Sequence, residues 1–166
     1  MQDDVVALFA YDRWANCKVV DACRNLTAEQ HASEPVPGWS SVRSTVSHIA
    51  LATELNLRTL VDGPVERMPT EADLATVDDA ARLLERAYRR FEALRPTLTP
   101  ERLNTVLTLR GRGWTLTLPP WALLRHIVNH STYHRGQIAA KLKRFGIEQP
   151  ATDFFFWVIE QIPQEA

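Results

Sequence analysis

The positions of the prolines constrain the fold of this chain more than any other feature. Ten prolines occur among 166 residues, and they leave long stretches that contain none. Proline disrupts the interior of a helix but is tolerated in loops and first turns, so each proline-free stretch can form one continuous helix. These stretches are 1–34, 38–63, 70–95 and 121–149. Each has room for about five helical turns or more, and we expect four long helices.

Apolar residues repeat at helical spacing in all four stretches. In the third, they form one side of the helix, with arginines and glutamates on the other; they are Ala80, Leu83, Leu84, Ala87, Phe91 and Leu94. Ser40 or Ser41 can cap the start of the second helix. Gly146 suits the end of the fourth. Four amphipathic helices of this length indicate a helical bundle.

Two shorter segments complete the chain. Residues 103–118 alternate apolar residues with threonine around a glycine-rich turn, a pattern typical of a hairpin. Residues 151–162 predict a short aromatic helix. We therefore expect a single all-α domain over residues 1–166: a four-helix bundle with a small hairpin before the fourth long helix and a short C-terminal helix.

Composition and charge exclude several functions. Nineteen basic and twenty acidic residues give a net charge of -1, which argues against a nucleic acid or an anionic membrane as the main partner. No apolar run approaches the roughly 18–20 residues of a membrane span. The start, Met-Gln-Asp-Asp, lacks the basic and apolar regions of a signal peptide. We expect a cytoplasmic protein whose Cys17 and Cys23 are reduced.

Five histidines, at positions 31, 48, 126, 130 and 134, are the candidate metal ligands. We expect His31, beside the first proline loop, to be exposed. His130 and His134 are four residues apart, so they share one helix face about 6 Å apart and can offer two imidazoles to one ion. Both belong to an apolar stripe, so we expect them to face the bundle interior. Most such pairs are structural or surface residues, and Ser131 after the first histidine excludes the zinc-protease motif.

A third ligand is needed from outside this pair. His126 and His134 lie about 12 Å apart along the helix axis, so three rings on one straight helix do not readily converge on an ion. A ligand from another helix is geometrically better. His48, in the second predicted helix, is the remaining helical candidate.

Three segments carry a resemblance to a known family. Residues 126–137 read His-Ile-Val-Asn-His-Ser-Thr-Tyr-His-Arg-Gly-Gln and resemble the signature helix of the DinB/YfiT superfamily. Gly-Trp-Ser-Ser at 38–41, leading into Ser-His-Ile-Ala at 47–50, resembles the second helix of that family. Residues 11–16 resemble its first helix. The resemblance covers nearly the whole chain in the same order.

This resemblance implies an up-down-down-up four-helix bundle, usually a homodimer, with a long second-to-third connection at 62–77. It also implies a divalent ion, zinc or nickel, held by His48, His130 and His134. Some members of the superfamily are metal-dependent transferases or isomerases that use low-molecular-weight thiols, and many have no assigned reaction.

Three functions stay open. Three neutral ligands leave an open coordination position, as in catalytic sites, which can take water or a thiol. The leading hypothesis is a metal-dependent transferase that moves a low-molecular-weight thiol onto an electrophilic small molecule. The second is a non-catalytic metal-binding dimer in stress response, since no general base lies near the histidines in sequence. The third, a metal-dependent hydrolase, needs a carboxylate base, for which Asp12 is better placed than Glu54.

Catalytic residues are candidates only. Tyr133 could orient a bound group. Arg135 and Gln137 are expected to point away from the ligand face and to serve helix packing or dimer contacts. Asp12, at a core position of the first helix, is a candidate that either accepts a hydrogen bond from a ligand imidazole or pairs with an arginine. His126 is expected to support or pack beside the ligands.

Overall fold

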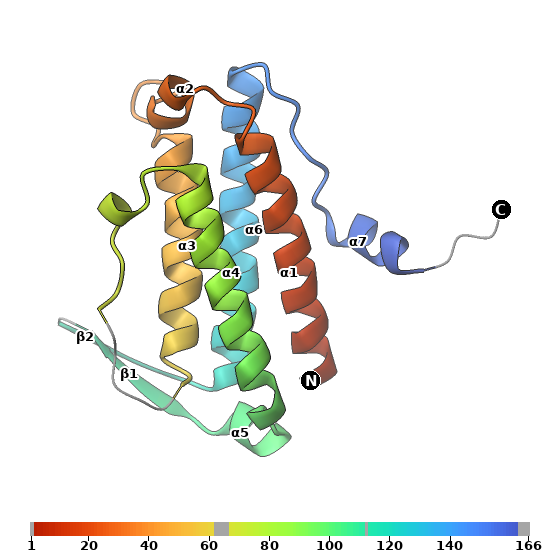
Figure 1. Ribbon diagram of the computed structural model, residues 1–166. Coiled ribbons are helices and arrows are strands. Elements are labelled where there is room, and N and C mark those ends of the chain that lie inside the picture. Colours follow the sequence, from red (N-terminus) through yellow and green to blue (C-terminus); the bar gives the residue numbers. More distant parts are fainter. Residues whose placement is uncertain (1, 62–66, 112, 163–166) are drawn as a thin grey trace.

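Four long helices form the body of the protein (Figure 1). The structure is a computed structural model that describes residues 2–61, 67–111 and 113–162. The long helices are α1 (Gln2–Cys23), α3 (Val42–Arg58), α4 (Val77–Leu94) and α6 (Pro120–Arg144). Figure 1 shows α1 and α6 running in one direction, and α3 and α4 in the other. The up-down-down-up bundle is therefore confirmed.

Side-chain caps define where the helices begin. The first proline-free stretch holds two helices rather than one, because Thr27 caps the short α2 (Ala28–Ala32) through a capping box. Ser41, one of the two expected caps, receives a hydrogen bond from the Ser44 backbone N–H at the start of α3. Gly146 follows α6 with a φ of 72°, a backbone conformation that glycine adopts without strain.

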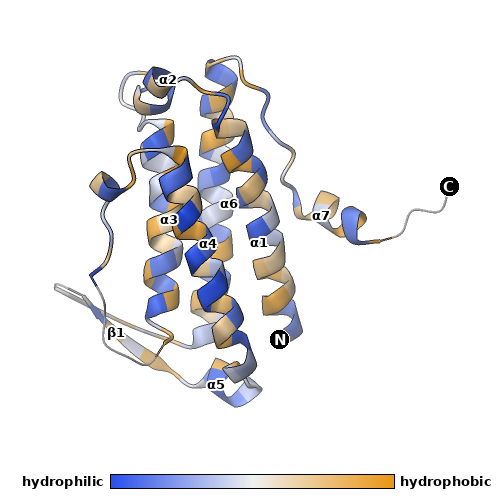
Figure 2. Cartoon of the chain, viewed as in Figure 1, coloured by the Kyte–Doolittle hydropathy of each residue, from blue (hydrophilic) through white to orange (hydrophobic). Residues whose placement is uncertain are grey.

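The core lies between the four long helices. Around the bundle the neighbours are α1 with α6, α6 with α3, α3 with α4, and α4 with α1. Figure 2 shows apolar and polar residues alternating along each helix, as expected when one side of each is buried. Phe9 of α1 and Phe91 of α4 stack with their ring centroids 3.9 Å apart. This arrangement makes α3 and α6 antiparallel neighbours, which decides where the histidines meet.

Smaller elements close the lower end of the bundle in Figure 1. The predicted hairpin is confirmed as β1 (Leu107–Gly111) paired antiparallel with β2 (Trp114–Leu118). It follows two short helices that the sequence did not predict, η2 (Arg95–Thr97) and α5 (Pro100–Asn104). The long connection between α3 and α4 contains η1 (Glu71–Asp73); its residues 62–66 lie outside the described residues.

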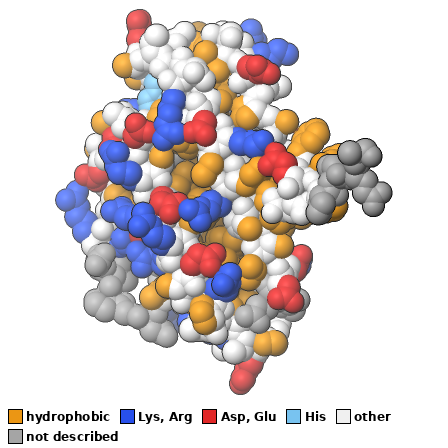
Figure 3. Space-filling view, turned by 45° about the vertical axis from the view of Figure 1, so that its right-hand side comes forward, with side chains coloured by type: hydrophobic (Ala, Val, Ile, Leu, Met, Phe, Trp, Pro, Cys, Tyr) orange, Lys and Arg blue, Asp and Glu red, His pale blue; other side chains and the backbone are white. Residues whose placement is uncertain are grey.

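The short C-terminal helix is also confirmed, as α7 (Phe154–Gln161). It projects from the side of α1 (Figure 1) and is held there by a 2.7 Å hydrogen bond from Trp14 Nε1 to Glu160 Oε2. Figure 3 shows apolar side chains where α7 leaves the bundle. Phe154, Phe155 and Phe156 are all exposed there. Of the helices that the structure describes, none is both long and apolar enough to cross a membrane.

Candidate metal centre

Three histidine side chains converge between α3 and α6. His48 comes from α3, and His130 and His134 come from successive turns of α6. The Nε2 atom of His130 lies 3.1 Å from that of His48 and 3.2 Å from that of His134. One nitrogen from each ring lies within 4.8 Å of the other two. The three residues proposed from the sequence therefore form one cluster that could hold a metal ion.

These nitrogen–nitrogen distances fit a divalent ion. With zinc–nitrogen bonds of about 2.0–2.1 Å, two ligand nitrogens lie about 3.3 Å apart in a tetrahedral site. Adjacent positions of an octahedral site at similar bond lengths are about 3.0 Å apart. The separations of 3.1 and 3.2 Å fall between these values. His130 is thus already at ligand spacing from each of the other two rings, and the spacing does not select one geometry.

Gln137 sets the tautomer of one ring. Its Oε1 atom lies 2.8 Å from His134 Nδ1. A carbonyl oxygen only accepts hydrogen bonds, so Nδ1 carries the proton and the neutral ring keeps its lone pair on Nε2, the atom in the cluster. Such a partner holds an imidazole in its ligating form. The expectation that Gln137 points away from the ligand face is wrong, because residues three apart on a helix are neighbours.

The cluster lies at the surface rather than in the core. His48 is exposed, and His130 and His134 are half-buried. The expectation that the pair faces the bundle interior is therefore wrong: His134 lies at the edge of the apolar stripe, with its ring centroid 4.6 Å from that of His48 on α3. A bound ion there would be reachable by small molecules.

Two of the rings are poor bases. Burial, with the neighbouring His134 and His48 rings, lowers the pKa of His130 to about 4. Burial and His134 also lower the pKa of His48, while Glu71 acts in the opposite direction. Both rings are therefore neutral at pH 7. Neutral imidazole is the form that binds metal.

Two other predicted residues lie beside the cluster. His126 is exposed, and its ring centroid is 5.4 Å from that of His130. Its nitrogens are not among those that converge, consistent with the geometric argument against three ligands on one helix. The Tyr133 side chain is exposed, with its ring 5.1 Å from the His134 ring in an edge-on arrangement.

Asp12 pairs with an arginine, the second of its two expected roles. Asp12 is fully buried, and Arg135 Nη1 donates to its Oδ1 over 2.6 Å. Tyr88 and Asn16 donate to its other oxygen. Among the described residues, no ring of the histidine cluster hydrogen-bonds to Asp12. Arg135 therefore serves the packing of α6 against α1, as expected, and points away from the ligands.

The sequence did not predict that Glu71 acts on the cluster, and it predicted the wrong exposure for His31. Glu71 lies on η1, 23 positions after His48 along the chain, yet its carboxylate influences the pKa of that histidine. No local signal predicts this, because it depends on the path of the connection. His31 is buried rather than exposed, with 7% of its surface accessible, because α2 folds back onto α3.

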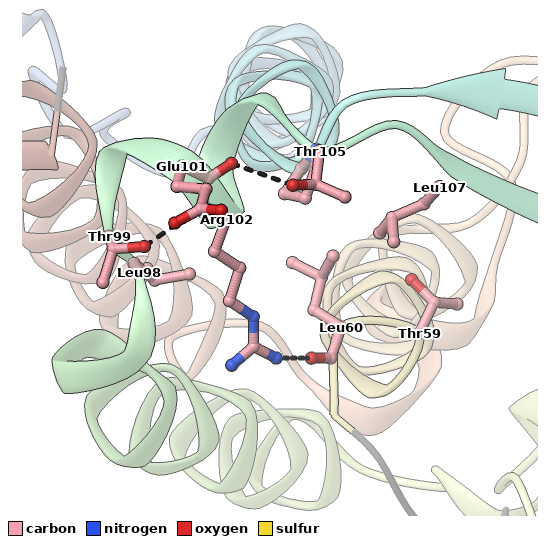
Figure 4. A pocket seen from close by; sticks show the side chains of 9 residues that line it. Thr59, Leu60, Leu98, Thr99, Glu101, Arg102, Thr105 and Leu107 are labelled. Atoms are coloured by element: carbon pink, nitrogen blue, oxygen red, sulfur yellow. Dashed lines mark hydrogen bonds between the residues drawn. The ribbon is translucent and has the colours of Figure 1, made fainter.

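Two cavities lie near opposite ends of α3. The first, of about 360 Å³, lies near the end of α3, between α5 and β1 (Figure 4). There Arg102 donates to the Leu60 carbonyl over 2.9 Å, and the described lining contains none of the histidines. The second, of about 520 Å³, includes Tyr133 and Gln137 in its lining and so adjoins the histidine cluster.

A helical bundle with three imidazoles converging from two antiparallel helices defines a class of candidate metalloproteins. Within this class the chain belongs to the DinB family, whose sequence model matches residues 1–165. It is 26% identical to the protein DinB of Bacillus subtilis (strain 168) in an alignment of 162 residues that covers 93% of this chain and 93% of that protein.

Solved structures show the same fold. A DinB-like protein from Bacillus cereus ATCC 10987 is 22% identical, with a TM-score of 0.73 over 90% of this chain and 95% of that one. A DinB-like protein from Bacillus subtilis is 16% identical, with a TM-score of 0.64 over 88% of this chain and 97% of that one. At these identities the likeness establishes the fold alone, so the reaction must be argued from the residues of the site.

Proposed function

We propose that this protein binds one divalent ion, zinc or nickel, through His48, His130 and His134. One observation carries the proposal: His130 Nε2 lies 3.1 and 3.2 Å from the Nε2 atoms of His48 and His134, and one nitrogen from each ring lies within 4.8 Å of the other two. Neutral imidazoles suit both metals. The Gln137 contact supports the proposal, because it fixes the lone pair of His134 toward the other two nitrogens.

We propose further that the site transfers a low-molecular-weight thiol to an electrophilic small molecule. When bound, a divalent cation supplies stabilisation of a thiolate over a thiol. In the transfer the thiol releases its proton to solvent, the sulfur forms a bond to an electrophilic carbon, and the leaving group departs from that carbon with its bonding electrons. Exposure of the cluster on one side supports this reaction, since both reactants must reach it. Tyr133, at the mouth of the adjoining cavity, is placed to orient a bound reactant.

A coupled set of variants tests the transfer. Purified protein is loaded with zinc or nickel and assayed with a panel of thiols and a chlorinated dinitrobenzene. We expect metal-stimulated conjugation that falls by a factor of ten or more in His48→Ala. His126→Ala, one turn from His130 and exposed, is the matched control and should keep the wild-type rate. Absence of metal-stimulated turnover with every thiol would refute the transfer and favour the non-catalytic metal-binding reading.

A hydrolase is the second candidate, and Glu71 is the observation that favours it. A metal-dependent hydrolase needs a carboxylate that can take a proton from water. Glu71 is exposed and acts on His48, whereas Asp12 is fully buried against Arg135. In this reading Glu71→Gln lowers ester or amide hydrolysis at least tenfold and leaves metal content unchanged. Equal rates in Glu71→Gln and wild type would remove Glu71 from the reaction.

We also propose that the protein is a homodimer. Three consecutive phenylalanines of α7 are exposed, at 43%, 66% and 43% for Phe154, Phe155 and Phe156. A contiguous exposed apolar surface is typical of an interface. Light scattering after size-exclusion chromatography should give twice the chain mass of 18.9 kDa. A monomer across the micromolar range would contradict the proposal.

A further inference from the structure

Lys141 of α6 is a buried cation whose contacts are all neutral. Only 3% of the residue is exposed. Its Nζ donates to Ser40 Oγ over 2.9 Å, to the Ser41 carbonyl over 3.4 Å and, in a shorter contact, to Thr45 Oγ1. Among the described residues it forms no ion pair. A buried ammonium without an anion is costly, and burial lowers the pKa of Lys141 accordingly.

The surroundings of this ammonium add positive rather than negative potential. Ser41 is the N-cap of α3, and Thr45 lies one turn into that helix. The N-terminal end of a helix carries partial positive charge and free backbone N–H groups. Glu71, a carboxylate that reaches this end of α3, contacts Ser44 and not Lys141. The ammonium and the helix end therefore face the same small region, and both favour an anion.

This region opens into the cavity that adjoins the histidine cluster. The cavity of about 520 Å³ is lined by Gly38, Trp39, Ser40, Tyr133, Gly136, Gln137, Ala140 and Lys141. Its volume suits a small organic molecule. Two of these lining residues are aromatic and exposed, Trp39 at 40% and Tyr133 at 67%. Gln137 contacts His134 through its carbonyl oxygen. The cavity thus joins a cation, two aromatic rings and the edge of the candidate metal centre.

We propose that this cavity binds a small organic carboxylate that carries a flat apolar group. The carboxylate replaces the Ser41 carbonyl, the most distant acceptor of Lys141 Nζ at 3.4 Å, and accepts a second hydrogen bond from the Ser40 hydroxyl. The apolar group lies against Trp39 and Tyr133. A single ammonium neutralises a single negative charge, which favours a carboxylate over a dianion. The inference deepens the proposed function by naming the substrate class of that site, and it rests on the proposed function only for the chemistry that follows binding.

Matched ligands test the charge requirement in the wild-type protein. The probes are 3-phenylpropanoate and its uncharged amide, 3-phenylpropanamide, titrated calorimetrically into protein freed of metal by a chelator. Hydrogen bonds to charged groups are stronger than neutral ones. We expect the carboxylate to bind at least roughly tenfold more tightly than the amide. Equal affinities, or no binding of either probe, would overturn the proposal without bearing on whether the histidines bind metal.

Matched variants assign the preference to Lys141. Lys141→Met keeps the length of the side chain without its charge and should bind both probes equally. Lys143→Met removes an exposed lysine two positions further along α6 and should keep the wild-type preference. Thermal melts show whether each variant is folded. If Lys141→Met does not fold, the comparison of the two probes in the wild-type protein still tests the proposal. A preference that survives in Lys141→Met would overturn the assignment. A preference seen only in metal-loaded protein would place the carboxylate on the metal and would equally overturn it.

Discussion

Removal of Arg135 is predicted to destabilise the protein strongly at neutral pH. Arg135 Nη1 donates to Asp12 over 2.6 Å and to Asn16 over 3.1 Å, while Nη2 donates to Thr132 over 2.7 Å and to Tyr11 over 3.1 Å. Removing one partner of a buried ion pair typically costs about 3–5 kcal/mol, because the other charge is left uncompensated. We expect Arg135→Met to lower the free energy of unfolding by an amount in this range.

Protonation of Asp12 limits the loss of unfolding free energy in Arg135→Met and makes that loss depend on pH. Burial raises the pKa of Asp12 above its ordinary value of 3.8, although the Arg135 guanidinium opposes the rise. Without Arg135 the pKa rises further, and the folded variant can neutralise the carboxyl. Protonating a group of ordinary pKa 3.8 at pH 7 costs about 4 kcal/mol, or about 1.4 kcal/mol per pH unit.

The sign of the pH dependence follows from proton uptake. Between the unfolded and folded pKa of Asp12, the folded variant binds more protons than the unfolded chain, so its stability falls as the pH rises. The difference in unfolding free energy between wild type and Arg135→Met should therefore be largest at pH 7. It should shrink by up to about 1.4 kcal/mol for each unit by which the pH is lowered. Tyr88, which donates to Asp12, stays protonated because burial and that carboxylate raise its pKa.

Urea denaturation of wild type and Arg135→Met at pH 5, 6 and 7 tests this prediction by measuring the free energy of unfolding. Arg144→Met, which removes an exposed arginine at the end of the same helix, is the control and should change stability by less than about 0.5 kcal/mol. Asp12→Asn combined with Arg135→Met should recover most of the loss, since no charge is left buried. A deficit below about 1 kcal/mol at pH 7 would show that the pair is not a buried charge pair of the expected kind. A deficit that does not change between pH 7 and 5 would refute the protonation argument.

Three further predictions concern single polar contacts. Gln137→Ala should weaken metal binding by about 10–100-fold, because the His134 ring loses its orienting partner; competition with a chromophoric chelator measures this, and unchanged affinity would contradict the role. Glu54→Gln should cost about 3 kcal/mol in urea, because Glu54 is fully buried against Arg90 and Arg58, whereas Glu85→Gln, which loses only exposed ion pairs, should cost less than about 1 kcal/mol. Burial and Arg43 lower the pKa of His31 below 6.5, so its contribution to stability is complete above pH 6.5 and is lost as the pH falls; the stability of wild type relative to His31→Phe should therefore decrease on acidification, and a constant difference would refute this.

The bundle could be predicted from the sequence because its determinants are local. Prolines mark where long helices cannot continue, and apolar spacing marks the side of each helix that is buried. The short helices α2 and α5 were not predicted as separate elements. Their starts depend on Thr27 and Thr99, whose hydroxyls accept backbone hydrogen bonds, and a single threonine is a weak signal beside a long apolar pattern.

The candidate site was predictable only as far as its ligands. His130 and His134 are joined by helix geometry, the argument against three ligands on one helix left His48 as the remaining helical candidate, and the family resemblance supported all three. The remaining features depend on contacts between distant segments. Glu71 reaches the site through the connection after α3. Lys141 meets Ser40, 101 positions away, and neither residue type is unusual at its own position.

The family resemblance predicts the metal ligands, whereas the structure shows which residues line the proposed substrate cavity. The resemblance to the DinB family predicts the bundle and the three histidines, and in the structure His130 Nε2 lies 3.1 and 3.2 Å from the Nε2 atoms of His48 and His134. The proposed substrate cavity combines Tyr133 and Gln137 of the signature segment with residues outside it, among them Lys141 near the end of α6 and Trp39 and Ser40 before α3. Variation there can change the ligand while the metal site is kept.

The metal content of protein purified without an affinity tag tests the central claim most directly. Elemental analysis after incubation with zinc or nickel and removal of the excess should find about one ion per chain in wild type. The same protocol should find one ion per chain in His126→Ala and less than about a tenth of that in His48→Ala, because three nitrogens converge on one point and two do not suffice. Stoichiometric metal in His48→Ala, or none in the wild type, would contradict the three-histidine site.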